Sequence, residues 1–317
     1  MSAGNSHEAT AWRTFQVAGA DGVEIAVHEL GGENGSATDL PVVLLVHGFP
    51  DDHHVWDLVA QDLARDHRVV AHDVRGAGAS GEPDLPDGYR MMALIEDIEA
   101  VAQSVAPGEK VHLVGHDWGS IQGWETVLHP VARGHFASYL SISAPPLQHV
   151  VPWRRAKLAE GPRGWFDMAN QLVRSTYIPA FHLPVADKAW KNIGPRWRAQ
   201  MKSVGAKVDD QWPSANIVDD AVRGMELYRA NIGLARKRAL PPISLPTDVA
   251  VHLLVAMDDP HVTVGLLDGL DAWAIKFTRS ELRAGHWVPR SHPEEVAAAI
   301  RTHVAANPAE HSLATTA

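Results

Sequence analysis

Asp117 is the central residue of a strand–turn–helix pattern, Val111-His112-Leu113-Val114-Gly115-His116-Asp117-Trp118-Gly119-Ser120. The pattern opens with a short apolar run typical of a buried strand, and apolar residues at helical spacing follow Ser120. A strand, a tight turn of small residues and a helix indicate a nucleophile elbow, whose central residue has a strained backbone. Within this stretch alone, an aspartate that caps the helix or forms the turn explains Asp117 equally well.

An aspartate at the elbow favours a different chemistry from a serine. A serine attacks acyl carbons and needs a base to activate its hydroxyl group. A carboxyl group has a pKa of about 4, so it is ionised at neutral pH without help. The carboxylate is a weak nucleophile, suited to a saturated carbon that carries a strained or good leaving group. Such an attack forms an alkyl ester on the enzyme, which a water molecule must then cleave.

The composition excludes several classes of protein. The 317 residues are enough for one large α/β domain with an insertion, or for two small domains. A net charge of −10 without a basic stripe argues against nucleic acid binding, and we see no basic amphipathic helix that would bind a membrane surface. The absence of cysteine excludes disulfides, thiolate metal sites and a cysteine nucleophile. Residues 1–11 lack the apolar core of a signal peptide, and no apolar run approaches the ~18 residues of a membrane span. We expect a soluble, cytoplasmic protein without stable membrane insertion.

Strand and helix patterns alternate along most of the chain. Besides the strand of the elbow, we expect strands at residues 14–17, 23–29, 41–46, 69–71, 137–143, 249–255 and 277–282, and helices at 55–63, 91–105, 120–129, 266–273 and 293–304. Asp21-Gly22 predicts a hairpin between the first two strands. Residues 31–39 read as a polar loop, and those after Ala305 as a loose tail. The alternation predicts an α/β fold with a parallel sheet and right-handed crossovers.

The alternation stops between Leu147 and Ala239. This segment has no buried strand pattern, is helical and rich in Trp, and is interrupted by several prolines. A helical insertion between two parts of an α/β sheet predicts a lid over the strand ends, where ligands bind in such sheets. The predicted organisation is therefore a first core part at 1–146, a helical cap at 147–239 and a second core part at 240–317.

Three further motifs accompany the elbow: His47-Gly48-Phe49-Pro50, Asp73-Val74-Arg75-Gly76-Ala77-Gly78-Ala79-Ser80 and Gly285-His286-Trp287. Together the four motifs resemble those of epoxide hydrolases of the α/β-hydrolase fold, with haloalkane dehalogenases as nearest relatives. An aspartate elbow followed by Trp118 excludes most esterases and lipases of the fold. The resemblance implies a mostly parallel eight-stranded sheet flanked by helices, with an inserted helical cap.

The resemblance also implies roles for individual residues. Asp117 matches the nucleophile and His286 the general base. Asp259 is the better match for the acid that orients the base, with Asp258 as the alternative. The backbone N–H groups of Phe49 and Trp118 match the oxyanion hole. The family also implies a cis peptide bond before Pro50. The other acid position that some relatives use, after the sixth strand, reads Ser143-Ala144-Pro145 and has no carboxylate.

Two tyrosines favour an epoxide hydrolase over a haloalkane dehalogenase. An opening epoxide becomes a basic alkoxide that needs a proton donor, and a phenol with a pKa of about 10 can supply the proton. Epoxide hydrolases carry two such tyrosines on the cap, and Tyr177 and Tyr228 match these positions. Amphipathic packing of cap tyrosines is the alternative explanation. Pro179 departs from a regular helix and is expected to end or kink it close to Tyr177.

The resulting hypothesis is an epoxide hydrolase that acts on a small apolar epoxide and water, with no cofactor or metal. We do not expect the adjacent His53 and His54 to bind a metal, because neighbouring side chains point apart. A haloalkane dehalogenase is the first alternative, although Phe49 stands where such enzymes often carry a halide-binding Asn, and Trp118 where fluoroacetate-type relatives carry Arg. A non-catalytic binding protein is the second. The epoxide, its stereochemistry, the pathway and the oligomeric state, a homodimer included, stay open at this level.

Overall fold

A computed structural model describes residues 11–31, 40–233 and 240–309. Most of the expected polar loop at 31–39 and the expected tail from residue 310 lie outside the described residues. The predicted start of the tail, directly after Ala305, was wrong, because the last helix continues to Ala306.

One eight-stranded sheet forms the centre of the described chain, in the order β1-β2-β4-β3-β5-β6-β7-β8. β1 pairs with β2 and β2 with β4 in antiparallel fashion, and all other neighbours are parallel, which confirms the predicted α/β class. The strands are β1 (Arg13–Ala18), β2 (Glu24–Leu30), β3 (Val42–Val46), β4 (Arg68–His72), β5 (Val111–His116), β6 (Phe136–Ile142), β7 (Ala250–Ala256) and β8 (Phe277–Leu282).

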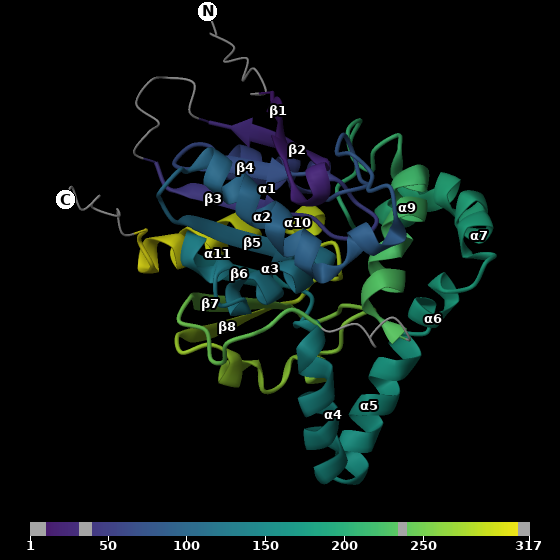
Figure 1. Cartoon of the computed structure of the whole chain (residues 1–317). Helices are drawn as coiled ribbons and strands as arrows, with labels where there is room; N and C mark the ends of the chain where they lie inside the picture. Colours follow the sequence, from purple (N-terminus) through teal and green to yellow (C-terminus); the bar gives the residue numbers. More distant parts are fainter. Residues whose placement is uncertain (1–10, 32–39, 234–239, 310–317) are drawn as a thin grey trace, which may run out of the picture.

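Helices cover both faces of the sheet, and the strands are apolar on both faces for that reason. In β3, Val42, Leu44 and Val46 contact one apolar cluster, whereas Val43 and Leu45 contact the other. α2 (Met91–Val105) and α3 (Trp118–Leu128) contribute to the first cluster, and α1 (Asp57–Leu63) and α11 (Pro293–Ala306) to the second. Figure 1 shows these helices around the strands.

A helical segment connects β6 to β7 and, in its described part, contains no strand, as expected from the sequence. Its helices are α4 (Val150–Ala159), α5 (Pro162–Arg174), α6 (Tyr177–Phe181), α7 (Ala186–Ile193), α8 (Trp197–Ser203) and α9 (Ile217–Asn231). They lie to one side of the sheet, and α4 and α5 form a hairpin that projects from the body of the molecule (Figure 1). We call residues 147–231 the inserted helices.

Two sequence predictions about helices were wrong. The helix expected at 266–273 is two short 3₁₀ turns, Val264–Leu267 and Leu270–Trp273, because Gly269 between them has a left-handed backbone with φ 83°. Pro179 does not end a helix. It lies in the first turn of α6, where its missing N–H costs nothing, and the break comes earlier, between Arg174 and Tyr177.

One of the inserted helices, α5, is amphipathic. α5 exposes apolar side chains on one side, including Phe166 and Leu172, and Arg163 lies in its first turn. The sequence hides this feature, because spacing alone does not say which side of a helix the core covers. Among the described residues, no helix has both the length and the hydropathy needed to cross a bilayer.

Candidate active site

The elbow places Asp117 between β5 and α3 with φ 53° and ψ −119°, a strained backbone for a residue other than glycine. Glycines on either side make the turn possible. A Cβ atom at Gly115 would lie 2.3 Å from the carbonyl oxygen of Gly119. A Cβ atom at Gly119 would lie 2.1 Å from the carbonyl oxygen of Val46. The sequence therefore brings three backbone segments into contact beneath one carboxylate.

His286 lies between two carboxylates. Its Nδ1 is 2.8 Å from Oδ2 of Asp259, and its Nε2 is 3.5 Å from Oδ2 of Asp117. The backbone N–H groups of His261 and Val262 donate to Oδ1 of Asp259 at 2.7 and 3.0 Å and so fix this carboxylate. The structure thus brings Asp117, Asp259 and His286 together, whereas the alternative Asp258 is exposed.

The other oxygen of Asp117 faces the loop after β3. The backbone N–H of Phe49 donates to Oδ1 of Asp117 at 2.7 Å, and the bond between Phe49 and Pro50 is cis, as expected. A Cβ atom at Gly48 would collide with the Asp117 side chain at 2.4 Å, so this loop approaches the carboxylate closely. Trp118 begins α3 directly after Asp117.

The two tyrosines lie on the inserted helices and contact each other. Tyr177 opens α6 and Tyr228 lies near the end of α9, and their ring centroids are 5.8 Å apart. The ring of Tyr228 also packs edge-on against Trp118 at 4.9 Å. Tyr228 is buried and Tyr177 is partly buried, so neither phenol points into bulk solvent.

One cavity of about 740 Å³ contains the carboxylate and both phenols. Its volume lies within the range of sites that hold small molecules. Its wall is mostly apolar, with Trp118, Ile121, Leu147, Val150, Trp153, Trp165, Met168, Leu172, Ile178, Ile232 and Leu266 among the lining residues. Arg154, Gln171, Ser175, Asn231 and His261 are polar members of the lining.

Burial and charge set the protonation states around His286. Burial lowers the pKa of His286, but Asp259 and Asp117 raise it more strongly, to about 10. Burial raises the pKa of Asp259, but His286 and the two backbone donors lower it to about 2. Burial also opposes the charge on Asp117, and the hydrogen bond to His286, the charges of His286 and His116 and the Phe49 N–H together lower its pKa. At neutral pH the site therefore holds an imidazolium between two carboxylates.

Both cavity phenols keep their protons at neutral pH. Burial and the Asp117 carboxylate raise the pKa of Tyr177. Burial, Tyr177 and Asp117 raise the pKa of Tyr228. The two hydroxyl groups can therefore donate hydrogen bonds to a ligand that lies over the carboxylate.

The sequence pattern of the alpha/beta hydrolase fold family matches residues 41–293. The chain belongs to this family. It is 34% identical over 296 residues to a probable oxidoreductase, EphD, of Mycobacterium bovis, a match that covers 88% of this chain and 47% of that protein. It is 24% identical to epoxide hydrolase 3 of Xenopus tropicalis over 82% of this chain and 70% of that one.

Solved structures agree with this assignment. A Bacillus megaterium epoxide hydrolase crystallised with an inhibitor superposes with a TM-score of 0.74, covering 92% of this chain and all of the other, at 20% identity. At that identity the likeness shows the fold. The chain spans about half the length of EphD, the first of the curated relatives.

Sequence reasoning missed one acidic residue near the base of this α/β hydrolase cavity, Asp51. Asp51 is 1% exposed and accepts hydrogen bonds from the indole N–H groups of Trp212 at 2.8 Å and Trp287 at 3.0 Å. Burial, with the nearby Asp52 and Asp117, raises the pKa of Asp51 to about 7. Trp212 belongs to the inserted helical segment and Trp287 follows His286, so Asp51 joins that segment to the loop that carries His286. Its position directly after His47-Gly48-Phe49-Pro50 was the available signal.

His261 was missed as well. Its ring lies 4.9 Å from the ring of His286 and 5.5 Å from that of Tyr177, and it lines the cavity. Burial and His286 lower its pKa, so it is a neutral polar group beside the base. No motif marked it, because only the turn after Asp259 brings it there.

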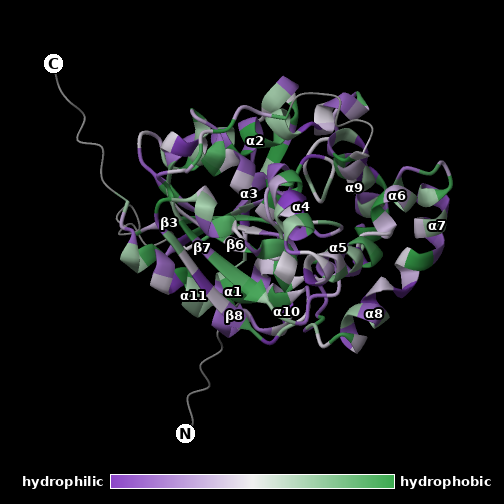
Figure 2. Ribbon diagram, turned by 90° about the horizontal axis from the view of Figure 1, so that it is seen from below, coloured by the Kyte–Doolittle hydropathy of each residue, from purple (hydrophilic) through white to green (hydrophobic). Residues whose placement is uncertain are grey.

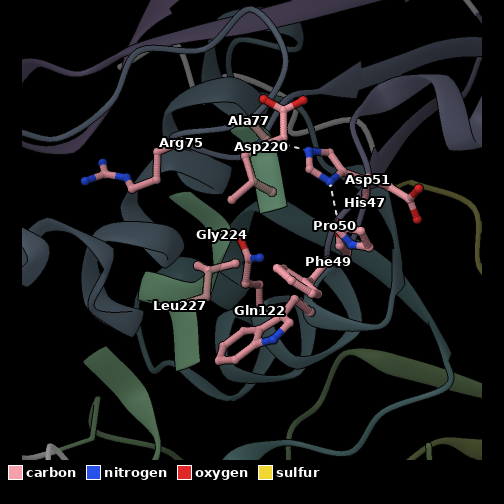
Figure 3. A pocket seen from close by; sticks show the side chains of 13 residues that line it. His47, Phe49, Pro50, Asp51, Arg75, Ala77, Gln122, Asp220, Gly224 and Leu227 are labelled. Carbon is pink, nitrogen blue, oxygen red and sulfur yellow. Dashed lines mark hydrogen bonds between the residues drawn. The ribbon is translucent and has the colours of Figure 1, made fainter. Parts of the chain in front are cut away.

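A second, very small cavity lies behind the Phe49 loop (Figure 3). Its volume of about 10 Å³ is close to that of a single water-sized sphere, so it cannot hold an organic ligand. Gln122 and Asp220 contribute to its lining, together with the Phe49 loop. The substrate-sized space is therefore on the Tyr177 side of Phe49.

His53 forms a cluster with His28 and Asp73, and not with the adjacent His54. His53, His28 and Asp73 place their ligand atoms within 4.8 Å of one another, the kind of cluster that can hold a metal ion. The rings of His28 and His53 are stacked at 3.4 Å with an angle of 11° between their planes, so their nitrogen lone pairs run parallel and do not converge. Both rings lie within hydrogen-bond distance of Asp73, at 3.0 and 2.8 Å. This geometry fits a buried hydrogen-bonded cluster that holds β2 next to the loop after β4.

Proposed function

We propose that the protein is an epoxide hydrolase that opens an epoxide to a vicinal diol through an ester on Asp117. One observation carries the proposal: the Asp117 carboxylate and the phenols of Tyr177 and Tyr228 line one cavity. A nucleophile on one side and two proton donors on the other are what opening an epoxide requires.

In the first step, Oδ2 of Asp117 attacks an epoxide carbon, because Oδ1 is held by the Phe49 N–H. A carbon–oxygen bond forms on the enzyme, and the bond from the same carbon to the epoxide oxygen breaks. That oxygen takes a proton from Tyr177 or Tyr228, since a phenol is a stronger acid than an alcohol. The products are an alkyl ester of Asp117 and a hydroxyl group on the neighbouring carbon.

In the second step, His286 acts as the base. Asp117 is one of the groups that raise the pKa of His286 to about 10. Esterification removes that negative charge, so the pKa of His286 falls and the ring can pass its proton through solvent to the phenolate left by the first step. Neutral His286 then takes a proton from water, which attacks the ester carbonyl carbon, while the N–H groups of Phe49 and Trp118 stabilise the oxyanion. The ester bond breaks, the alkoxide takes the second proton of the attacking water and the diol leaves, which restores the Asp117 carboxylate and the His286 imidazolium.

We further propose that residues 147–239 act as a cap that supplies the proton donors and most of the apolar wall. Trp153, Trp165 and Met168 line the cavity from this segment. An apolar epoxide of substantial size fits such a wall better than a small polar one. The residues named here supply every group that the reaction uses, so the proposal needs no cofactor.

A single turnover in heavy-oxygen water tests the ester. With enzyme in excess over styrene oxide, the label should enter Asp117, as measured by peptide mass, and the diol should carry none. Direct labelling of the diol would rule out the ester mechanism. His286→Gln should accumulate the intact ester adduct, because attack still occurs and hydrolysis fails.

Removal of the phenols separates epoxide from halide chemistry. Tyr177→Phe and Tyr228→Phe should each slow ring opening roughly 10- to 100-fold, the size of a lost proton donor. Tyr89→Phe is the matched control, because the Tyr89 hydroxyl is buried outside the cavity lining and has no hydrogen-bond partner among the described residues. Halide release from a bromoalkane without diol formation would favour a dehalogenase. Inactivity on both substrate classes would favour a binding protein.

A further inference from the structure

α5 carries two neighbouring rows of apolar side chains. Trp165 and Leu172 form one row, and Phe166 and Val173 form the other, each with the spacing of about two helical turns. Phe166 is 71% exposed and Val173 is 69% exposed. Trp165 and Leu172 line the cavity, whereas Phe166 and Val173 do not. The outer row is therefore an apolar surface without a described partner, next to the cavity wall.

Basic side chains accompany this surface. Residues 150–174 carry five Lys and Arg against two Asp and Glu, a local charge of +3 in a chain whose net charge is −10. Arg155 and Arg163 are exposed, and neither makes an ion pair within the part of the chain that the structure describes. Lys157 in contrast is buried and paired with Asp167 and Asp268. Arg163, three residues before Phe166 on α5, is therefore a neighbour of the exposed apolar row, and Arg155 adds a second exposed charge on α4.

We propose that the α4–α5 hairpin is a docking surface for an anionic lipid membrane. Apolar side chains that enter the boundary of the bilayer, flanked by Arg that attracts anionic headgroups, are the features of a helix that lies on a membrane. Each basic residue close to an anionic surface strengthens binding by about 1 kcal/mol. The hairpin projects from the body of the molecule, so it can reach a flat surface without a collision of the sheet (Figure 1). In the view of Figure 2, α4 and α5 lie at the front of the molecule.

A second copy of the chain fits this surface less well. A symmetric dimer through the hairpin would place two segments of like charge, each +3 over residues 150–174, against each other. An anionic membrane surface would instead attract these positive charges. The docking does not depend on the proposed reaction, but it places the row of Trp165 and Leu172, and with it the cavity, next to the lipid.

Vesicle sedimentation tests the proposal. The full chain is mixed with phosphatidylcholine vesicles that contain about one phosphatidylglycerol in four lipids, or none. The wild type should bind the anionic vesicles and detach at about 0.5 M salt, because the Debye length then falls to a few ångströms. Phe166→Ser with Val173→Ser, and Arg155→Glu with Arg163→Glu, should each weaken binding about tenfold or more.

Matched surface variants serve as controls. Val131→Ser with Ile275→Ser removes apolar groups that are 66% and 68% exposed on the core, and Arg65→Glu reverses an exposed core charge. These variants should bind vesicles like the wild type, and all variants should turn over a small soluble epoxide at the wild-type rate. The proposal is overturned if the wild type does not bind anionic vesicles, or if the core variants weaken binding as much as the hairpin variants. Concentration-dependent dimers that only the hairpin variants abolish, without vesicle binding, would assign the surface to a second copy instead.

Discussion

Asp117 combines a strained backbone with a charged side chain that is largely removed from solvent. Its carboxylate lies beside the charged His286. The strain points the side chain out of the turn, and the Phe49 N–H and His286 keep the charge on the carboxylate despite burial. Because one oxygen is bound to the loop, the other is the one that faces a ligand. The direction of attack is therefore set by hydrogen bonding at a single residue.

We expect the hydrogen bonds from the indole groups of Trp212 and Trp287 to Asp51 to hold His286 in position. Trp287→Phe removes one indole donor to Asp51, and the loop that carries His286 should become less well fixed. We expect hydrolysis of the Asp117 ester to slow roughly tenfold, equivalent to about 1.4 kcal/mol, with little change in the rate of ester formation. Rapid-quench measurement of the adduct separates the two rates.

Trp197→Phe is the matched control for that experiment. Trp197 packs against Trp287 with 5.4 Å between ring centroids, but its indole N–H has no hydrogen-bond partner among the described residues. The control should leave ester hydrolysis unchanged. Equal effects of the two substitutions would mean that packing, and not the hydrogen bond to Asp51, positions the base.

At the scale of elements, the elbow depends on contact between backbones. Gly119→Ala would place a Cβ atom 2.1 Å from the Val46 carbonyl oxygen, and neither α3 nor β3 can move aside without a loss of core packing. We expect a loss of stability of about 3 kcal/mol or more, measured by urea unfolding. Gly134→Ala meets no atom within 4 Å and should be tolerated. Similar stability of both variants would contradict the predicted close contact.

Glu125 on α3 links the same helix to both ends of the inserted segment. Gln148 donates to Oε2 of Glu125 and to the Pro241 carbonyl oxygen, each at 3.1 Å, and the Glu125 side chain is fully buried. Burial raises the pKa of Glu125 to about 7. The folded state therefore binds a proton that the unfolded chain releases above a pH of about 4.5.

The raised pKa of Glu125 determines how the stability of the fold changes with pH. Glu125 contributes its full stability below a pH of about 4.5, and this contribution is lost as the pH rises to about 7. Glu125→Gln should remove the loss, so the variant should gain roughly 3 kcal/mol relative to the wild type between pH 4.5 and pH 8. Urea unfolding at several pH values measures the gain, with Glu24→Gln, an exposed residue at the start of β2, as the control. A pH-independent difference would refute the proton linkage.

At the scale of the whole molecule, the cavity exists only because distant segments meet. Asp117 follows β5, His261 lies in the loop after β7, and Tyr177 and Tyr228 come from the inserted helices. None of these elements encloses a substrate alone. The volume of about 740 Å³ is therefore a property of how the inserted helices lie against the sheet.

This arrangement predicts a dependence on substrate size. Met168→Trp should fill part of the cavity and lower kcat/KM for bulky aryl epoxides about tenfold, because one displaced apolar contact is worth 1–3 kcal/mol. Turnover of a short alkyl epoxide should change little. Phe166→Trp adds similar bulk on α5 outside the cavity lining and should leave both substrates unaffected. A uniform loss on all substrates would indicate a general defect of the cap.

The local patterns of the sequence were sufficient for most elements of the fold. A continuous apolar run such as Val42–Val46 buries all of its side chains only if helices cover both faces of the strand. Such runs therefore predicted central strands. The spacing of residues 91–105 predicted α2 with its observed bounds. The 266–273 segment failed, because Gly269 breaks a pattern that was read from its apolar residues alone.

The sequence by itself determined the elbow, the oxyanion loop and the identity of the charged groups, because these features depend on neighbouring residues and on side-chain chemistry. Only the tertiary structure decided that His286 is bonded to Asp259 and not to Asp258, that Asp51 joins two indoles from distant segments, and which side of α5 is exposed. Those outcomes depend on which residues far apart in the chain come within a few ångströms. No local pattern encodes such distances.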